Sequence, residues 1–390
     1  MINQFIKNNI KNIYYRILLK KYQRKQFYAY DSFDFKRFNE HIISYVKNMQ
    51  WKSFYEYKFS GLQEQADLYS SVYAAMIFGL FGEIKKMSVN EKKQWADYLL
   101  SHQREDGLFR DDKLNSPKSE TYHYWGWHHL APHMLIALDY LDSKPYYDFQ
   151  IILNLFKKQS MDYWLENRDW KGNYLAVSNE IMNVGLLLQC SRELFSNELS
   201  GQLVQEMKLW LITNQRDPKT TLWGHDTRTS IFNISKAIKT AYHIIPIFYF
   251  DKEENLLEVD RILRYTLQTQ NPIFGFSPFI ISDACEDVDS TYLLSIFYSN
   301  NEILDKNVVQ ALRKYFDWVF MNMNNDCGFV FRRFQPFQYA DQPLLSSKKN
   351  QSNMFGTWFR TLSIAFACTR LNIKHQFQFS KVPGYQFYRE

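Results

Sequence analysis

The chain has 390 residues, of which 46% are hydrophobic, 23% charged and 18% aromatic. This composition excludes disordered, collagen-like and low-complexity proteins, and the 13 Gly and 10 Pro are too few for a turn-dense β-sandwich or propeller. The formal net charge is +6, and no apolar run is long enough to span a membrane. We therefore expect a globular, mainly helical protein, and the aromatic content suggests an aromatic-lined cavity.

Residues 1–50 predict a basic amphipathic helical segment. Apolar side chains recur there at helical spacing and Lys and Arg occupy the other faces; the apolar ones are Ile6, Ile10, Ile13, Tyr14, Ile17 and Leu18. Such a helix either docks on an anionic lipid surface or packs on the domain with a solvated basic side. We expect a cytoplasmic protein, possible association with the inner membrane face, and no nucleic-acid partner, because no basic stripe or nucleic-acid motif follows.

A repeat organises the rest of the chain, residues 51–390. Each copy has an aromatic residue on a helix, then a polar residue, then a glycine with an aromatic neighbour, as in WADYLLSHQREDGLF and YTLQTQNPIFGF. The glycines recur at intervals of roughly fifty residues, which holds two helices and their connections, and they are Gly107, Gly172, Gly224, Gly275 and Gly328. Charged helices alternate with apolar ones, so we predict an all-α fold, a single α/α toroid with an outer and an inner ring. An open solenoid is the competing architecture.

The segments QREDGLF, NQRDPKTTLWG and QTQNPIFGF resemble the Q-and-W repeats of the terpenoid cyclase and protein prenyltransferase superfamily. The resemblance covers roughly residues 60–370 and implies the toroid fold. It does not by itself assign a function, which has to come from the site.

Several inner helices are expected to begin with polar or aromatic residues, and these starts would meet at one mouth of a toroid. The first begins near His123, Trp125, Trp127 and His129, where His133 lies one helical turn on. That spacing would suit a metal pair or an active-site wall, but no zinc-protease motif is present, and we predict no cofactor. The other candidate binding residues are Asn179, Asn183, His225, Asp226, His243, Arg332, Arg333 and Trp358.

The sequence Asp287-Val288-Asp289-Ser290-Thr291 carries the main candidate for catalysis. It resembles the Asp-x-Asp-Asp-Thr motif of class II terpene cyclases, which implies that Asp289 is the proton donor and Asp287 its neighbour, although Ser290 departs from the motif. Crowded carboxylates raise at least one pKa in a dry site, as a general acid requires. Alternatively Asp287 caps the helix, and the helix dipole lowers these pKa values.

Three functions remain open on sequence alone. The preferred one is a terpenoid-cyclase-like enzyme that protonates an isoprenoid in an aromatic-lined cavity. The second is a carbohydrate-active enzyme, a lyase, hydrolase or epimerase of a bacterial polysaccharide, whose basic rim would bind an acidic sugar. The third is a toroid that binds a partner without catalysis. A long apolar cavity would favour an isoprenoid, and an open polar cavity a sugar.

Overall fold

The computed structural model describes residues 13–20, 22, 28–115, 126–224 and 229–389. Regular structure in these ranges is almost entirely helical. The two named strands, β1 (Phe337–Gln338) and β2 (Ser346–Ser347), pair as one short antiparallel hairpin. The predicted all-α class is therefore confirmed.

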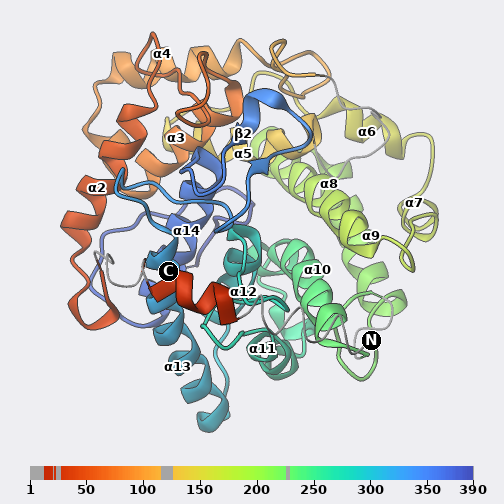
Figure 1. Ribbon diagram of the computed structural model, residues 1–390. Coiled ribbons are helices and arrows are strands. Elements are labelled where there is room, and N and C mark those ends of the chain that lie inside the picture. Colours follow the sequence, from red (N-terminus) through yellow and green to blue (C-terminus); the bar gives the residue numbers. More distant parts are fainter. Residues whose placement is uncertain (1–12, 21, 23–27, 116–125, 225–228, 390) are drawn as a thin grey trace.

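Six helices of the described chain form a closed inner ring, which Figure 1 shows in view along its axis. In order round the ring they are α3 (Leu68–Leu80), α5 (Trp127–Tyr140), α8 (Tyr174–Phe195), α10 (Ile231–Phe250), α12 (Ala284–Ile296) and α14 (Met354–Arg370). Each helix packs on the next, and α14 packs back on α3. This last contact closes the ring, so the fold is a single toroid and the open solenoid is excluded.

The remaining helices lie outside the ring (Figure 1). They are α2 (Phe35–Asn48), α4 (Val89–Leu100), α6 (Gln150–Phe156), α7 (Met161–Glu166), α9 (Glu198–Asn214), α11 (Val259–Gln268) and α13 (Glu302–Val319). Every residue of the inner helix α3 is buried, whereas α11 buries only one stripe, made by Ile262, Leu263 and Thr266. Apolar helices therefore fill the inner ring, and amphipathic helices cover them with one face toward water.

The polar residue of the repeat joins each turn to the next outer segment. The side-chain amide of Gln103 donates to the carbonyl oxygens of Gly107 (3.1 Å) and Tyr147 (2.9 Å). That of Gln270 donates to Phe274 O (3.1 Å) and to Ala311 O (2.8 Å) on α13. The repeat motif thus satisfies backbone groups at helix ends and sets the spacing between neighbouring hairpins.

The repeated glycine is required for two different reasons. Gly107 has φ +94°, a backbone conformation that favours glycine. At the last repeat the preceding residue, Cys327, takes the positive φ (66°), and Gly328 is needed for space, because a Cβ there would lie 2.4 Å from Tyr45 Cε2. An unusual backbone angle at the glycine is therefore found in only part of the repeats.

The C-terminal tail, residues 371–389, crosses the end of the ring where the inner helices finish. Gln378 N donates to Leu80 O at the end of α3 (2.8 Å), and Tyr140 OH at the end of α5 donates to Gln378 O (2.6 Å). Tyr388 OH donates to Ser295 O near the end of α12 (3.0 Å). The tail therefore covers this end, and the helix N-termini form the opposite mouth.

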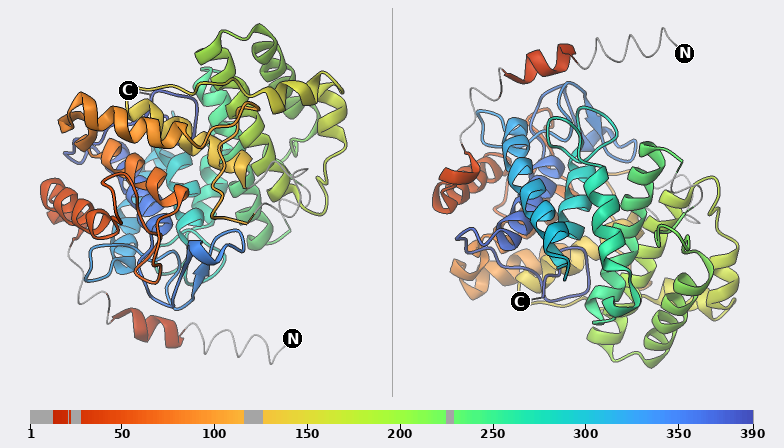
Figure 2. Two further views of the ribbon diagram at one scale, coloured as in Figure 1. Left: turned by 90° about the horizontal axis from the view of Figure 1, so that it is seen from above. Right: turned by 90° about the horizontal axis from the view of Figure 1, so that it is seen from below.

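The N-terminal segment was assigned to residues 1–50, and its described part has two helices. Residues 13–20 form a helix outside the ring (Figure 2), in which Leu19 is buried and Tyr15 stacks on Phe334 at 5.2 Å. Ile13, Tyr14 and Ile17 of this helix stay exposed, and its association with lipid remains a prediction. The second helix, α2, packs on α3 as the outer helix of the first pair. Among the described residues no helix has both the length and the apolarity to span a membrane.

Candidate active site

The mouth of the ring brings together side chains that are far apart in the sequence. His129 on α5 and His243 on α10 influence each other electrostatically although α8 stands between their helices in the ring, so both face the interior. The hairpin before α14 reaches the same place, because Tyr339 OH lies 2.8 Å from His129 Nδ1. The predicted convergence of inner-helix residues on a shared interior is therefore observed for these helices.

The start of α12 is fixed by a capping box. The carboxylate of Asp283 accepts a hydrogen bond from Glu286 N (2.7 Å), and the carboxylate of Glu286 accepts one from Asp283 N (3.0 Å). Two cations bridge to this pair: Lys239 Nζ lies 3.0 Å from Glu286, and Arg332 Nη2 lies 2.6 Å from Asp283 and 3.0 Å from Glu286. The box therefore ties α12 to α10 and to the loop before β1. The cap is Asp283, so the alternative that Asp287 caps the helix is wrong.

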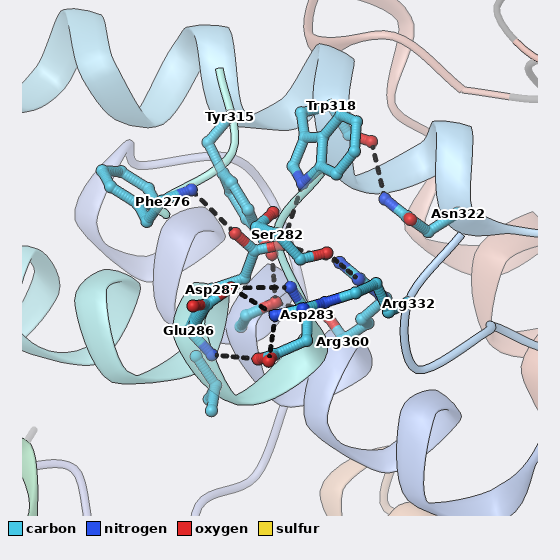
Figure 3. A network of polar contacts seen from close by, with 12 residues as sticks. Phe276, Ser282, Asp283, Glu286, Asp287, Tyr315, Trp318, Asn322, Arg332 and Arg360 are labelled. Atoms are coloured by element: carbon cyan, nitrogen blue, oxygen red, sulfur yellow. Dashed lines mark hydrogen bonds and ion pairs between the residues drawn. The ribbon is translucent and has the colours of Figure 1, made fainter. Parts of the chain in front are cut away.

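Asp287 lies at the centre of a buried clamp between α12, α13 and α14, which Figure 3 shows. One carboxylate oxygen accepts from Arg360 Nη1 (2.7 Å) and Trp318 Nε1 (2.8 Å), and the other accepts from Phe276 N (2.9 Å). Asp287 and Arg360 are both fully buried. Burial raises the pKa of Asp287, while Arg360 and the two N–H donors oppose that shift. With its oxygens occupied, Asp287 holds helices together and does not face a substrate.

Asp289 differs from Asp287 because of helix geometry. Two residues along an α-helix turn a side chain by about 200°, so the two carboxyls point to nearly opposite sides. Asp289 is 4% exposed, and no hydrogen bond between described residues involves its carboxyl group. Burial raises its pKa well above the ordinary value, Lys239 partly opposes this, and Asp283, Glu286 and Asp287 add to it. The carboxyl group of Asp289 therefore keeps its proton to a higher pH than an ordinary aspartate does.

Three histidines line the opposite part of the interior. His129 and His133 lie with ring centroids 4.7 Å apart, as their four-residue spacing predicts, and His243 Nδ1 lies 2.9 Å from Ser178 Oγ on α8. Burial lowers the pKa of His133 to about 4 and that of His243 to about 3, and it lowers the pKa of His129 well below its usual range. All three imidazoles are consequently neutral at pH 7 and can accept a proton or a hydrogen bond.

Several tyrosines complete the interior, and no sequence motif indicated them. Tyr385 comes from the C-terminal tail, lies 5.2 Å from the His133 ring and stacks on Phe359 at 5.9 Å. Tyr73 on α3 meets His133 edge to face at 5.6 Å. The hydroxyl of Tyr73 and Nε2 of His133 are buried and have no hydrogen-bond partner. Lys239 was also missed, although its four-residue spacing from His243 places both on one face of α10.

The structure places the other predicted residues as follows. Asn179 and Asn183 lie one turn apart on α8, the first partly exposed and the second buried. Trp127 begins α5 and lines a small recess with Tyr69, and Trp358 lies fully buried beside Tyr385.

The two adjacent arginines have different positions. Arg332 reaches the capping box described above. Arg333 is not brought to the interior, because its guanidinium donates to Met321 O (2.9 Å), Met323 O (2.8 Å) and Asn324 Oδ1 (2.6 Å). His123, Trp125, His225 and Asp226 lie outside the described residues. Among the described residues no group of three or more His, Cys, Asp or Glu side chains is arranged to hold a metal ion.

Comparison with known proteins gives one similar structure to report. No protein-family model matches the chain, and no curated protein matches it. A solved structure of the GH76A α-1,6-mannanase from Salegentibacter sp. HEL1_6 aligns with 87% of this chain and 100% of its own, with 10% sequence identity and a TM-score of 0.44.

The resemblance to terpenoid cyclases and prenyltransferases inferred from the sequence is not upheld: no family model matches the chain, and the similar solved structure is a mannanase. The Gln and Gly positions that carried the resemblance make structural contacts of the toroid turns, so they do not identify a chemistry. The terpenoid-cyclase function is corrected with it. The polar groups within the ring include the carboxyl of Asp289, the ammonium group of Lys239, the imidazoles of His129 and His243 and the phenol of Tyr339, to which a purely apolar isoprenoid would offer no partners.

Proposed function

We propose that the protein is a carbohydrate-active enzyme that cleaves a glycosidic bond at the mouth of the ring, with Asp289 as the general acid. The observation that carries this proposal is the state of Asp289: its carboxyl group is buried, has no hydrogen-bond partner among the described residues, and has a raised pKa. Such a group favours its protonated form, as a general acid must.

The lining of the interior favours a sugar as the substrate. Sugar hydroxyls need donors and acceptors at several positions, and His129, His243 and Tyr339 provide them from three separate elements. Phe232, in the first turn of α10, and Phe279, in the loop before α12, are about half exposed, and their rings meet edge to face at 5.4 Å. Exposed rings of this kind can stack on the apolar faces of sugar units.

The chemistry follows from the charges around Asp289. As a water molecule attacks the anomeric carbon and the glycosidic C–O bond breaks, the proton of Asp289 passes to the leaving oxygen and leaves a carboxylate behind, while the attacking water gives up one proton. Lys239 is electrostatically coupled to Asp289 and stabilises that carboxylate. The imidazoles of His129 and His243, whose pKa values are lowered by burial, act as neutral hydrogen-bonding groups for the sugar and the water, and the proton released by the water passes to the solvent.

The test is an activity screen with a matched pair of variants. Purified protein is incubated with neutral and acidic polysaccharides, including mannan, xylan, alginate and polygalacturonate. New reducing ends report any cleavage, and ultraviolet absorbance reports the unsaturated sugars that elimination would form. Asp289→Asn should lose about 10²–10⁴-fold in rate. The control, Asp142→Asn, changes an exposed aspartate that pairs with Lys92 on the outside and should keep the rate.

Two results would count against the proposal. One is an Asp289→Asn variant as active as the unaltered enzyme. The other is a folded protein that cleaves none of the polysaccharides, which would favour a toroid that binds without catalysis.

A further inference from the structure

From the α8–α10 wall of the mouth we infer that the substrate is an acidic sugar, a hexuronate unit whose carboxylate is bound by Lys236 with Asn179 beside it. This inference rests on the proposed function and narrows its substrate class.

Lys236 lies on the face of α10 that fronts the interior. Asn233, Lys236, Lys239 and His243 follow one another at three- or four-residue spacing, and each is partly exposed while most residues between them are buried. Lys239 reaches across to Glu286 on α12, and His243 influences His129 across the ring. Lys236 is one turn closer to the mouth than Lys239, so its ammonium group stands where a substrate would enter.

Among the described residues, Lys236 is the cation of the α8–α10 wall that forms no ion pair with a carboxylate. Its Nζ lies 4.1 Å from the centre of the Tyr174 ring on α8, and within the described chain no Asp or Glu lies within ion-pair distance of it. Lys239 and Arg332, by contrast, share the carboxylates of Asp283 and Glu286. A partly buried ammonium group without a counter-ion is stabilised when an anion binds to it.

Asn179 on the neighbouring helix supplies a second polar group without a partner. Its side-chain oxygen is buried and makes no hydrogen bond, while the residue remains partly exposed. It follows Ser178, which contacts His243, so it belongs to the same wall as Lys236. The free Oδ1 of Asn179 can accept a hydrogen bond from a sugar hydroxyl, and its amide N–H groups can donate to a carboxylate.

The charge balance points the same way. With Asp289 protonated, the carboxylates of Asp283 and Glu286 are matched by Lys239 and Arg332. Of Lys236, Lys239 and Arg332, Lys236 alone then has no carboxylate partner among the described residues. One cation and one amide suit a singly charged carboxylate better than a doubly charged phosphate.

Binding measurements on Asp289→Asn, which holds the site but should not turn over, test the inference. The probes are oligomers of galacturonate, mannuronate and glucuronate, each compared with its carboxyl-reduced form by isothermal titration calorimetry. We expect at least one uronate oligomer to bind about tenfold or more tightly than its reduced form. Lys236→Met, added to Asp289→Asn, should abolish this preference and leave binding of the reduced form unchanged. Lys306→Met, which removes an exposed cation of the outer helix α13, is the matched control and should have no effect.

The outcomes separate this inference from the function on which it rests. Equal affinity for charged and reduced oligomers, or a charge preference that survives Lys236→Met in a variant with unchanged circular dichroism, would overturn the inference. If the unaltered enzyme cleaves a neutral polysaccharide and Lys236→Met cleaves it equally well, the function stands and the inference fails. If a uronate binds through Lys236 but no polysaccharide is cleaved, the inference about the ligand stands and the catalytic proposal fails.

Discussion

The buried clamp between Asp287 and Arg360 gives the sharpest stability prediction. Replacing Arg360 by Met removes the ion pair at 2.7 Å and the hydrogen bonds that the guanidinium donates to Val330 O (3.0 Å) and Phe331 O (2.9 Å). Asp287 would remain fully buried with only Trp318 Nε1 and Phe276 N as donors. Removing one partner of a buried ion pair typically costs about 3–5 kcal/mol, and we expect Arg360→Met to lower the free energy of unfolding by that amount.

A double-mutant cycle distinguishes the pair from the packing around it. Asp287→Asn keeps the shape of the side chain but leaves a buried guanidinium that still reaches three carbonyl oxygens, those of Ser282, Val330 and Phe331, so we expect a loss of about 2–4 kcal/mol. The double variant should be more stable than the sum of the two losses predicts, since neither charge is then left unpaired.

The assay is urea unfolding followed by circular dichroism, with the midpoint and slope fitted for each variant. A loss below about 1 kcal/mol for Arg360→Met, or strictly additive losses in the cycle, would refute the view that Asp287 is a structural carboxylate. Asp287 would then have to be reconsidered as a catalytic residue.

Three further predictions concern pH and packing. Because the folded pKa of Asp289 is raised, cleavage should be retained below that pKa, beyond the range of an ordinary aspartic acid, and lost as the pH rises through it. A pH–rate profile that rises with pH throughout the range would contradict this. Burial lowers the folded pKa of His133 to about 4 and that of His243 to about 3. The free energy of unfolding should therefore be highest above about pH 6.5 and should fall below it, by up to about 1.4 kcal/mol per pH unit for each imidazole. Urea midpoints at pH 7 and pH 5 measure this, and His133→Gln should flatten the dependence. Gly328→Ala should lower the free energy of unfolding by about 1–3 kcal/mol because its Cβ would meet the Tyr45 ring at 2.4 Å. The control Gly61→Ala, whose Cβ would lie 3.5 Å from a flexible Gln351 side chain, should change stability little. Equal thermal midpoints for the two variants would contradict the packing argument.

What the sequence determined by itself is the architecture. The Gln of the repeat makes the same turn contact at Gln103 and at Gln270. The alternation of charged and apolar helices requires an outer and an inner layer, so the toroid could be predicted. Local patterns also located the acidic start of α12 and the paired histidines on α5. The histidines could be paired because residues four apart lie on the same face of a helix.

Only the tertiary structure decided which of these carboxyl groups is engaged by a partner. Asp287 and Asp289 are nearly equivalent in sequence, but Arg360, seventy-three residues further on, pairs with Asp287, while no described residue forms a hydrogen bond with the carboxyl group of Asp289. Tyr385 and Tyr339 reach the interior from a tail and a hairpin that carry no motif. The chemistry of a carboxyl group is set by burial and by partners from distant segments, and the local sequence carries no record of either.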